Sequence, residues 1–388
     1  MARPLKILMI SQMAPYLPCN DGFRIIPANV IKRLAGRHEV HLMAFTDGHD
    51  SSEQLDWAKP FCASVMHVAT PPPVSGWSRL RRMQEPYPLP DAALDRIKKL
   101  RPDVLHLEGP YMASLARHAP AGCGTVLSAH DCMALRYEHF ARFAESLRQK
   151  LRFRVLGTLG ARYERRWYPQ VDRVVVTSAL DADRLTRMAP AVHVLVIPNG
   201  VEIAAPAAVH RVARRMIFTG NMSWFPNEDA AEFFVQQILP RIRREYPDAE
   251  FWIVGSSPSP RVQELGKTPG VVVTGTVPVL SEYIRAAEVY VSPLRFGAGV
   301  KNKILEAMAA DVPIVATPIS LSGTPLFSGR HLLVAEKPAE IAEAVTKIFQ
   351  QPDLAASLTQ ESLRELQARY TWDRIADQFD AIYSSLAG

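Results

Sequence analysis

The sequence predicts an α/β protein with two parallel β-sheets, one in each half of the chain. Short apolar runs alternate with helix-length segments, and runs that are apolar throughout are typical of parallel strands covered on both faces. At 388 residues the chain is too long for one ordinary hydrophobic core. A turn at Pro198-Asn199-Gly200 and an alanine-rich, basic connector over 203–215 divide the two series of strands. We therefore expect domains over 1–200 and 201–370, followed by a last amphipathic helix over 371–388.

The first half contains seven apolar runs of strand length. We expect strands at residues 6–11, 39–45, 64–69, 103–107, 125–128, 173–177 and 193–197. Ligands of a parallel sheet bind beyond the carboxyl ends of its strands, so residues at those ends are the first candidates for chemistry. Gly22 and Arg24 follow the first strand, Glu108 follows the fourth, and His130 and Asp131 follow the fifth.

The second half repeats the pattern, with strands expected at residues 216–219, 250–254, 271–274, 289–292 and 313–316. The fourth of these leads through a glycine loop into a helix expected over 301–310. Glycines ahead of a helix let the backbone approach a ligand, and the free N–H groups of the first turn attract anions. A sugar nucleotide would offer its diphosphate to the amides and lysines, and its ribose diol to Glu306. Such loops are common in α/β proteins, so spacing alone leaves a purely structural interpretation equally open.

The segment Glu306-Ala307-Met308-Ala309, followed by Pro313-Ile314-Val315, resembles the donor-site signature of family 4 glycosyltransferases. These are retaining enzymes with the GT-B fold, in which two Rossmann-like domains have parallel sheets facing across an interdomain cleft. Residues 196–202 resemble the family's interdomain crossover, so the resemblance spans both halves. It implies transfer of a sugar from a nucleotide-diphosphate donor, with no metal or other cofactor. It also implies a C-terminal helix that crosses back to the first domain.

Two departures from the family pattern affect the donor site. Ala298 stands where most members have an acidic residue, eight positions before Glu306, and the loop resembles that of a subgroup with Gly-x-Gly-x-Lys-x-Lys. The loop after residues 216–219 lacks the usual basic residues, so we expect Lys301, Lys303 and backbone amides to hold the diphosphate. The resemblance implies a donor-binding set of Gly220, Asn221, Gly297, Ala298, Gly299, Val300, Lys301, Lys303 and Glu306.

The catalytic and acceptor residues are expected in the first domain. In the resembling family a histidine at the position of His130 contacts the donor sugar near its reacting carbon, although a lone histidine is more often structural. Asp131 fits a helix cap as well as a substrate contact. Glu108 fits an acceptor contact as well as a solvated loop acid. We expect His130, Gly22 and Asp131 to act in catalysis, and Glu108 and Arg24 to bind the acceptor.

No metal or nucleotide-triphosphate site is expected. The pair Asp181-x-Asp183 matches a metal-binding pattern only weakly, and its place at a helix start favours a structural role. The four cysteines lack metal-ligand spacing and are expected to be reduced thiols of a cytoplasmic protein. No apolar run approaches the roughly 18 residues of a transmembrane helix, and the N-terminus reads as a strand rather than a signal peptide.

A basic, aromatic-bearing stretch lies over 140–167. From 141 to 167 there are eight Lys or Arg against two Glu, an excess of +6 that equals the formal charge of the whole chain. Apolar residues recur there at helical spacing, so the stretch could lie on an anionic membrane. A helix packed on the sheet with a solvated face is the alternative. In the first case the acceptor would be lipid-linked, as in surface polysaccharide or glycolipid assembly at the inner membrane face.

Two other functions compete with glycosyl transfer. A sugar-nucleotide epimerase of the same architecture would need acid and base carboxylates in its cleft, for which Glu108 and Asp131 are the candidates. A non-catalytic protein that binds nucleotide-sugars or nucleic acid is the other. No nucleic-acid motif accompanies the basic stretch, so a nucleic-acid partner is not expected.

Overall fold

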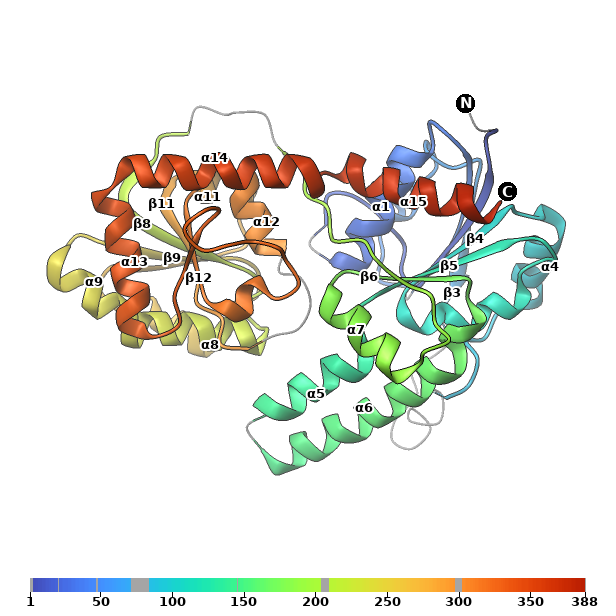
Figure 1. The fold of residues 1–388 in the computed structure, drawn as a ribbon, viewed down its shortest axis with the longest axis horizontal. Helices are drawn as coiled ribbons and strands as arrows, with labels where there is room; N and C mark the ends of the chain where they lie inside the picture. Colours follow the sequence, from blue (N-terminus) through green and yellow to red (C-terminus); the bar gives the residue numbers. More distant parts are fainter. Residues whose placement is uncertain are drawn as a thin grey trace. The chain divides into compact units, whose positions relative to one another are not determined.

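The structure is a computed structural model, which describes residues 3–19, 21–46, 48–70, 84–144, 146–203, 209–296 and 302–387. The chain divides into two compact units. The first unit comprises Met1–Asn199 together with Trp372–Gly388, and the second comprises Gly200–Thr371. Each unit contains a parallel sheet flanked by helices (Figure 1). The predicted α/β class with two Rossmann-like domains is therefore confirmed.

The sheet of the first unit has seven strands in the order β3-β2-β1-β4-β5-β6-β7. The strands are β1 (Lys6–Ser11), β2 (Glu39–Thr46), β3 (Ser64–Ala69), β4 (Val104–Glu108), β5 (Gly124–His130), β6 (Arg173–Val176) and β7 (Val194–Val196). Two of them extend further than predicted, because Glu108 ends β4 and His130 ends β5. Both functional candidates therefore stand on the sheet itself rather than in the loops after it.

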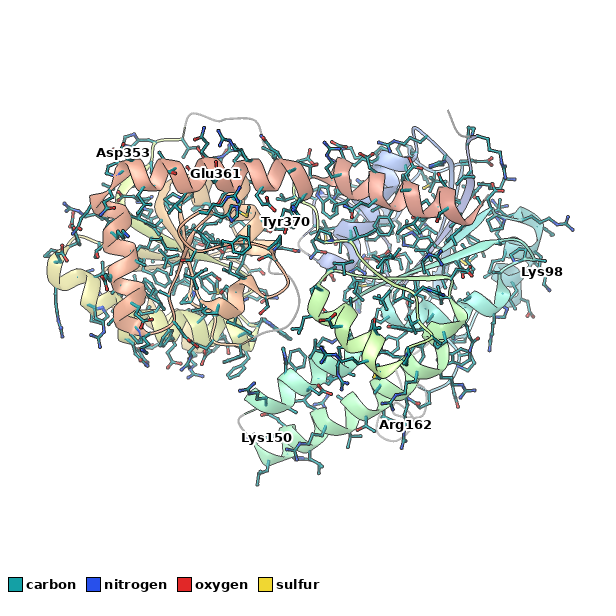
Figure 2. All side chains as sticks on the ribbon, in the orientation of Figure 1. Lys98, Lys150, Arg162, Asp353, Glu361 and Tyr370 are labelled. Atoms are coloured by element: carbon teal, nitrogen blue, oxygen red, sulfur yellow. The ribbon has the colours of Figure 1, made fainter. Side chains whose placement is uncertain are left out.

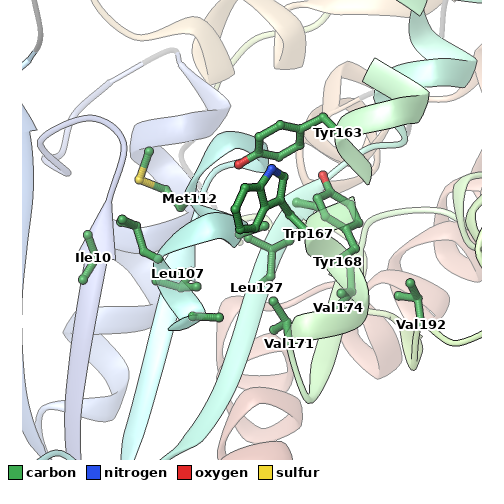
Figure 3. Close-up of a cluster of buried hydrophobic side chains, with 14 of the residues drawn as sticks. Ile10, Leu107, Met112, Leu127, Tyr163, Trp167, Tyr168, Val171, Val174 and Val192 are labelled. Atoms are coloured by element: carbon green, nitrogen blue, oxygen red, sulfur yellow. The ribbon is translucent and has the colours of Figure 1, made fainter. Parts of the chain in front are cut away.

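Helices cover both faces of this sheet. They are α1 (Gly22–Leu34), α2 (Ser52–Asp56), α4 (Asp91–Leu100), α5 (Met133–Phe143), α6 (Leu147–Trp167), α7 (Ala179–Met188) and α15 (Trp372–Leu386), with 3-10 turns η1 (Pro110–His118) and η2 (Tyr168–Gln170). Along β1, Leu8 and Ile10 enter one buried cluster while Ile7 and Met9 enter the other. Figure 3 shows the first of these clusters, where Tyr163, Trp167 and Tyr168 lie beside Leu107 and Leu127.

The last helix, α15, packs on the first unit beside α1. Its residues Ile375, Ala376 and Phe379 recur at helical spacing and enter the buried cluster opposite to that of Figure 3. Arg33 of α1 pairs with Asp373 at 2.8 Å, and Arg37 pairs with Asp377 at 2.7 Å. The C-terminal segment therefore completes the core of the unit in which the chain begins.

The sheet of the second unit has six strands in the order β10-β9-β8-β11-β12-β13. They are β8 (Val212–Thr219), β9 (Glu250–Val254), β10 (Val271–Gly275), β11 (Ala287–Ser292), β12 (Ile314–Ala316) and β13 (Leu333–Val334). The two-residue strand β13 was not predicted, because so short a run has no readable period. The expected connector over 203–215 ends earlier than predicted, since β8 begins at Val212.

The helices of the second unit are α8 (Phe225–Phe233), α9 (Leu239–Glu245), α10 (Pro260–Leu265), α11 (Leu280–Arg285), α12 (Asn302–Ala309), α13 (Pro338–Gln350) and α14 (Pro352–Arg369), with a π-helical turn η3 (Phe234–Ile238) and a 3-10 turn η4 (Pro318–Leu321). The predicted helix after the glycine loop is α12. Among the helices that the structure describes, none is long and apolar enough to cross a lipid bilayer.

Candidate active site

The first unit collects its functional candidates where the strand order reverses. Moving outward from β1, the chain adds β2 and β3 on one side and β4 to β7 on the other. Such a reversal opens a crevice at the carboxyl ends of the two central strands, here β1 and β4. The backbone N–H of Gln12, just after β1, donates to the carbonyl of Glu108 at 3.0 Å. The ends of these two strands are thus joined, and His130 follows on the next strand.

The backbone of His130 is held in an unusual conformation. Its φ angle is +67°, in the left-handed region that few residues other than glycine adopt, and the strand register shifts between Ser128 and His130. Thr177 fixes this turn, because its N–H and its hydroxyl both donate to the His130 carbonyl at 2.9 Å. The imidazole lies 4.5 Å, between ring centroids, from Phe23 of α1. Left-handed backbone held by several contacts is typical of functional positions.

Glu108 is the electrostatic centre of this site. The side chain is 1% exposed, and its two carboxylate oxygens meet different imidazoles: Oε1 lies 2.6 Å from His130 Nε2, and Oε2 lies 3.0 Å from His106 Nε2. Burial by itself raises the pKa of a carboxyl group, but the two histidines outweigh it and lower the pKa of Glu108 to about 2. The acceptor role predicted for Glu108 is therefore revised, since a buried carboxylate turned toward two histidines does not face a ligand.

Asp131 neither caps α5 nor lies free. Its carboxylate pairs with Arg136, one turn into the helix, at 3.1 Å. The first N–H groups of α5 instead donate to carboxyl oxygens from two other helices. Asp181 Oδ1 accepts from the N–H of Cys132 at 2.9 Å, and Glu164 Oε1 accepts from the N–H of Met133 at 2.7 Å. Asp181 thus has the structural role that its sequence context favoured.

Gly22 and Arg24 lie at the start of α1, on either side of Phe23. No heavy atom outside the neighbouring residues lies within 4 Å of the position that a Gly22 Cβ would take, so the backbone there borders open space. Arg24 is buried, and its Nη1 lies 2.8 Å from Asp50 Oδ1 and 2.7 Å from the carbonyl oxygen of Ala14. These contacts commit Arg24 to fixing the loop after β1, which revises its predicted role in acceptor binding.

The second unit has its own reversal of strand order, between β8 and β11. Gly220 follows β8 with a φ of +155°, and a Cβ there would lie 2.6 Å from Asn227 Nδ2. Gly255, after β9, packs so closely that its Cβ would lie 1.8 Å from the Gly220 carbonyl oxygen. Both positions therefore require glycine, and the loop carrying Gly220 and Asn221 is pressed onto its neighbours.

Lys303 of α12 is anchored above this loop. Its Nζ donates to Asn227 Oδ1 at 2.7 Å and lies 4.2 Å from the ring centroid of Phe218. Asn227 Nδ2 in turn donates to the carbonyl of Asn221 at 2.8 Å. Asn227 lies inside α8 and ties the loop to Lys303. A cation is thereby held at the carboxyl end of β8.

Glu306 lies one turn after Lys303 on α12, half-buried. Burial raises the pKa of its carboxyl group, and the nearby charge of Lys303 partly offsets that rise. The remaining predicted donor residues, Gly297, Ala298, Gly299, Val300 and Lys301, lie outside the described residues. The structure thus brings together Gly220, Asn221, Lys303 and Glu306.

Sequence reasoning missed Arg295. It stands three residues after β11, and its guanidinium makes a two-pronged contact with Asp229 of α8, with Nε 2.8 Å from Oδ2. The guanidinium also lies 4.9 Å from the ring centroid of Phe233. About half of the side chain remains exposed. Its position just past a strand end was the available signal, since the same rule had singled out His130.

Within the described ranges, no three His, Cys, Asp or Glu side chains are grouped so that they could hold a metal ion. Asp183, the second acid of the weak metal-binding pattern, is exposed on α7, whereas Asp181 is buried at the start of that helix.

Two family models match the chain, one in each half of the sequence. Residues 26–205 match Glycosyltransferase Family 4, and residues 213–351 match Glycosyl transferases group 1. Among curated proteins, an uncharacterized 44.6 kDa protein in the cps region of Klebsiella pneumoniae is 20% identical, over 88% of this chain and 90% of its own length. The phosphatidyl-myo-inositol mannosyltransferase of Mycobacterium leprae is 26% identical over 49% of this chain. That alignment spans about half of the mannosyltransferase, 53% of its length.

Solved structures share the fold over the whole chain. Sucrose-phosphate synthase from Thermosynechococcus elongatus has a TM-score of 0.72 at 19% identity, covering 99% of both chains. HepE from Anabaena, solved in complex with UDP and glucose, has a TM-score of 0.67 at 14% identity, covering 98% of this chain and 100% of its own. The chain, with its two Rossmann-like domains, thus has the GT-B fold.

Proposed function

Because this chain is a glycosyltransferase of the GT-B type, we propose that it transfers a sugar from a nucleotide-diphosphate donor to a lipid-linked acceptor, with retention of the anomeric configuration. The observation that carries the donor assignment is the arrangement of Lys303 and Glu306 on α12, above the Gly220 loop. It combines a fixed cation, a half-buried carboxylate and a closely approachable backbone. A nucleoside diphosphate needs all three.

Each part of this arrangement has a chemical role in the proposal. Lys303 and the N-terminal end of α12 stabilise the negative charge that develops on the departing nucleoside diphosphate. Arg295 adds a second cation at the neighbouring strand end. Glu306 accepts hydrogen bonds from the ribose hydroxyls. These protein cations supply the counter-charge, so transfer needs no divalent metal.

The first unit places the sugar and the acceptor in this proposal. His130 contacts the transferred sugar, and the open space beside Gly22 admits the reacting groups. These residues contribute by position. Holding the reactants in a productive geometry lowers the barrier without any covalent bond between the protein and the substrate. Asp131, paired with Arg136, has a supporting place at the edge of this site.

The epimerase alternative loses support from the same geometry. It requires a carboxyl pair able to give and take protons at the substrate. Glu108 is buried between two imidazoles with its pKa lowered to about 2, and Asp131 is paired with Arg136. Neither carboxylate is placed for that work. A non-catalytic binding protein would have no use for the strained His130.

The acceptor proposal rests on the hairpin formed by α5 and α6, which projects from the rest of the first unit (Figure 1). The two helices approach closely because α6 presents glycines: Cβ atoms at Gly157 and Gly160 would lie 3.3 Å from the Cβ of Tyr137 and 3.1 Å from that of Met133. One face of α6 is thereby committed to α5. Its opposite face points away from α5 and is exposed.

The exposed face of α6 carries a central line of apolar side chains along the first half of the helix. Leu147, Leu151 and Val155 are 84%, 65% and 40% exposed, and their spacing of four residues puts them in one stripe. Cations flank the stripe on both sides, and no acidic residue occurs from 147 to 163. They are Arg148 and Arg152 on one side, and Lys150 and Arg154 on the other. Figure 2 marks Lys150 near the tip of the hairpin and Arg162 nearer the sheet.

An apolar stripe between two rows of cations is suited to the interface of an anionic membrane. The leucines and the valine would enter the boundary between head groups and acyl chains, while the arginines and the lysine meet the lipid phosphates. We therefore place the first unit at the inner face of the membrane, where a lipid-linked acceptor is available. The alternative, a helix with an ordinary solvated face, does not account for the exposed leucines.

The donor assignment is tested by Glu306→Gln, which removes the carboxylate and keeps its shape. The donor class is first found by thermal shift with UDP-, GDP- and dTDP-sugars, with GDP-mannose and UDP-glucose in the panel, because ligand at 100 times its Kd adds about 2.7 kcal/mol to stability. With the donor in hand, kcat/KM of the variant should fall by roughly 100-fold, as expected when a charged hydrogen-bond partner is lost.

The matched control for this test is Glu282→Gln, an exposed glutamate in the first turn of α11 in the same unit, which should keep full activity. Anomeric NMR of the product distinguishes retention from inversion. Unchanged kcat/KM for the donor in Glu306→Gln would contradict the assignment. Conversion of the donor into an isomer when no acceptor is present would establish the epimerase instead.

A further inference from the structure

We infer that Tyr383, His106 and Glu108 form a buried positioning chain, which fixes His130 in a single tautomer. In that tautomer the proton sits on Nε2, facing Glu108, and Nδ1 is the ring nitrogen left for a ligand. The inference rests on the proposed role of His130 in sugar transfer. It adds three residues that do not touch the substrate, and one of them comes from the far end of the sequence.

The chain starts from the ionised carboxylate of Glu108. An ionised carboxylate can only accept hydrogen bonds, so any proton shared with it belongs to its partner. Its Oε1 is 2.6 Å from His130 Nε2, and its Oε2 is 3.0 Å from His106 Nε2. The His130 contact lacks hydrogen-bond alignment in the structure, but at 2.6 Å an unprotonated nitrogen would face the carboxylate lone pair against lone pair. Both imidazoles therefore carry a proton on Nε2. The tautomer of His130 is set by this geometry rather than by solvent.

The next member, His106, is held from its other side. Its Nδ1 contacts the hydroxyl of Tyr383, and both side chains are fully buried. With the proton of a neutral His106 on Nε2, Nδ1 has a free lone pair, so the tyrosine hydroxyl donates. The ring of Phe379 lies 5.3 Å away, between centroids, and closes the pocket. Removal of the Tyr383 hydroxyl would leave a buried nitrogen without its partner, which buried polar groups avoid.

Tyr383 itself is positioned by α15. The helix enters the core of the first unit and pairs with α1 through Asp373 and Asp377. Tyr383 and His106 are 277 positions apart in the chain. The state of His130 thus depends on whether the C-terminal helix is docked. The described contacts run without a gap from α15 to the end of β5.

The chemical consequence is a preset hydrogen-bonding role for His130. With Nε2 committed to Glu108, Nδ1 of a neutral His130 accepts a hydrogen bond and can orient a sugar hydroxyl. Without Glu108 the ring would exchange tautomers and could turn. A fixed tautomer avoids that reorganisation when the substrate arrives, and in other enzymes an acid that sets a histidine tautomer matters strongly to the rate.

The test combines a spectroscopic readout with kinetics on the full-length enzyme. Nitrogen-15 shifts of labelled histidines distinguish the two tautomers, and His130→Asn and His106→Asn assign the signals. In the wild type, His130 should show one tautomer with its proton on Nε2. In Glu108→Gln the amide can donate as well as accept, so the His130 signals should move toward the other tautomer or an average. The kcat should then fall by roughly 100-fold, with little change in KM.

Tyr383→Phe provides a milder variant in case Glu108→Gln does not fold. It should shift the His106 signals, and more weakly those of His130, and lower kcat severalfold. The matched control is Tyr163→Phe, which removes another buried tyrosine hydroxyl of the same unit, one that donates to the Tyr111 carbonyl at 2.5 Å. That control should lower thermal stability and leave the His130 signals and kcat unchanged.

The outcomes separate this inference from the proposed function. If Glu108→Gln and Tyr383→Phe lower only the melting temperature and the His130 signals stay in place, the positioning chain is wrong. If the signals shift while kcat and KM do not, the positioning chain is supported and the proposed role of His130 in transfer is wrong. If both change together, both are supported.

Discussion

Two buried glutamates of the first unit, Glu108 and Glu164, have carboxyl pKa values displaced in opposite directions. Burial raises the pKa of both groups. At Glu108 the imidazoles of His130 and His106 overcome burial, and the pKa falls to about 2. At Glu164 the opposing contacts are mainly backbone N–H groups at the start of α5, which are too weak, and the pKa rises to about 8. Neighbouring charge, rather than depth, thus decides which of the two is ionised at neutral pH.

The raised pKa of Glu164 predicts that stability falls as the pH rises. The folded carboxyl keeps its proton up to about pH 8, whereas the unfolded chain loses it near the ordinary value of 4.5. The folded state therefore binds the extra proton between these values, and the stability it provides is complete below the lower value and lost through the upper one. The loss should be on the order of a few kcal/mol. Glu164→Gln should flatten this slope between pH 5 and 8.

Urea unfolding of wild type and Glu164→Gln at several pH values measures the effect. Glu53→Gln, an exposed glutamate on α2, serves as the control and should follow the wild type. Parallel pH slopes for wild type and Glu164→Gln would show that Glu164 is already ionised in the folded protein at neutral pH.

At the scale of the element, α6 has two faces with different tasks. Its inner face carries Gly157 and Gly160, which allow α5 to approach, and Glu164, which accepts N–H groups at the start of that helix. Its outer face carries the apolar stripe of Leu147, Leu151 and Val155 with flanking cations. An ordinary surface helix reverses this arrangement, with its apolar residues toward the core. The outward stripe is the reason for proposing that this helix meets a membrane surface.

Reversing the four flanking charges should release the protein from anionic vesicles. Each Lys or Arg near an anionic surface contributes about 1 kcal/mol, so changing Arg148, Lys150, Arg152 and Arg154 to Glu should weaken binding by roughly 1,000-fold. Wild-type binding should also weaken with salt, because the attraction is screened over about 10 Å at 0.1 M. Co-sedimentation with vesicles that contain or lack anionic lipid measures both.

A matched control reverses four cations on other helices, Lys98 and Lys99 of α4 and Arg241 and Arg244 of α9, which leaves the net charge equal to that of the test variant. This control should pellet with vesicles like the wild type. Release by both variants would mean that net charge alone drives binding. Equal pelleting of the wild type and the hairpin variant, or none by either, would favour a solvated helix and a soluble acceptor.

At the scale of the whole molecule, each unit gathers polar residues at the carboxyl ends of its central strands. The first unit offers His130 with its buried support, and the second offers Lys303, Glu306 and Arg295. All of the cations in the second set belong to the protein. The proposed chemistry is therefore divided between one unit that positions the sugar and acceptor and another that holds the departing diphosphate.

This division predicts transfer that persists without divalent metal. Lys303 and Arg295 are both fixed by hydrogen bonds, so the counter-charge is in place before the donor arrives. Turnover in 5–10 mM EDTA, roughly a thousandfold excess over micromolar enzyme, should stay within about twofold of the untreated rate, well under 1 kcal/mol of barrier. Loss of activity that Mg²⁺ or Mn²⁺ restores would overturn this prediction.

The sequence by itself determined the two sheets, the strands that carry the candidate site and the family resemblance. Strand and helix patterns depend on which residues are buried. A strand that is buried on both faces appears in the sequence as an almost continuous apolar run, as at residues 6–11 and 250–254. Glycines after strands indicated where the backbone packs closely, because a close approach such as that at Gly220 excludes any side chain. Position after a strand was enough to name His130 as a candidate, and a place on the helix after a glycine loop did the same for Glu306.

Only the tertiary structure decided what those residues contact. Nothing local connects Tyr383 with His106, Asp229 with Arg295, or Glu164 with the start of α5, because each pair is joined by packing between distant segments. For this reason Glu108, which the sequence presented as an acceptor contact, is found buried against His130 and His106. Periodicity also showed that α6 is amphipathic but not which face α5 would cover. The direction of an apolar stripe is fixed by the partner helix, and the partner is a property of the fold.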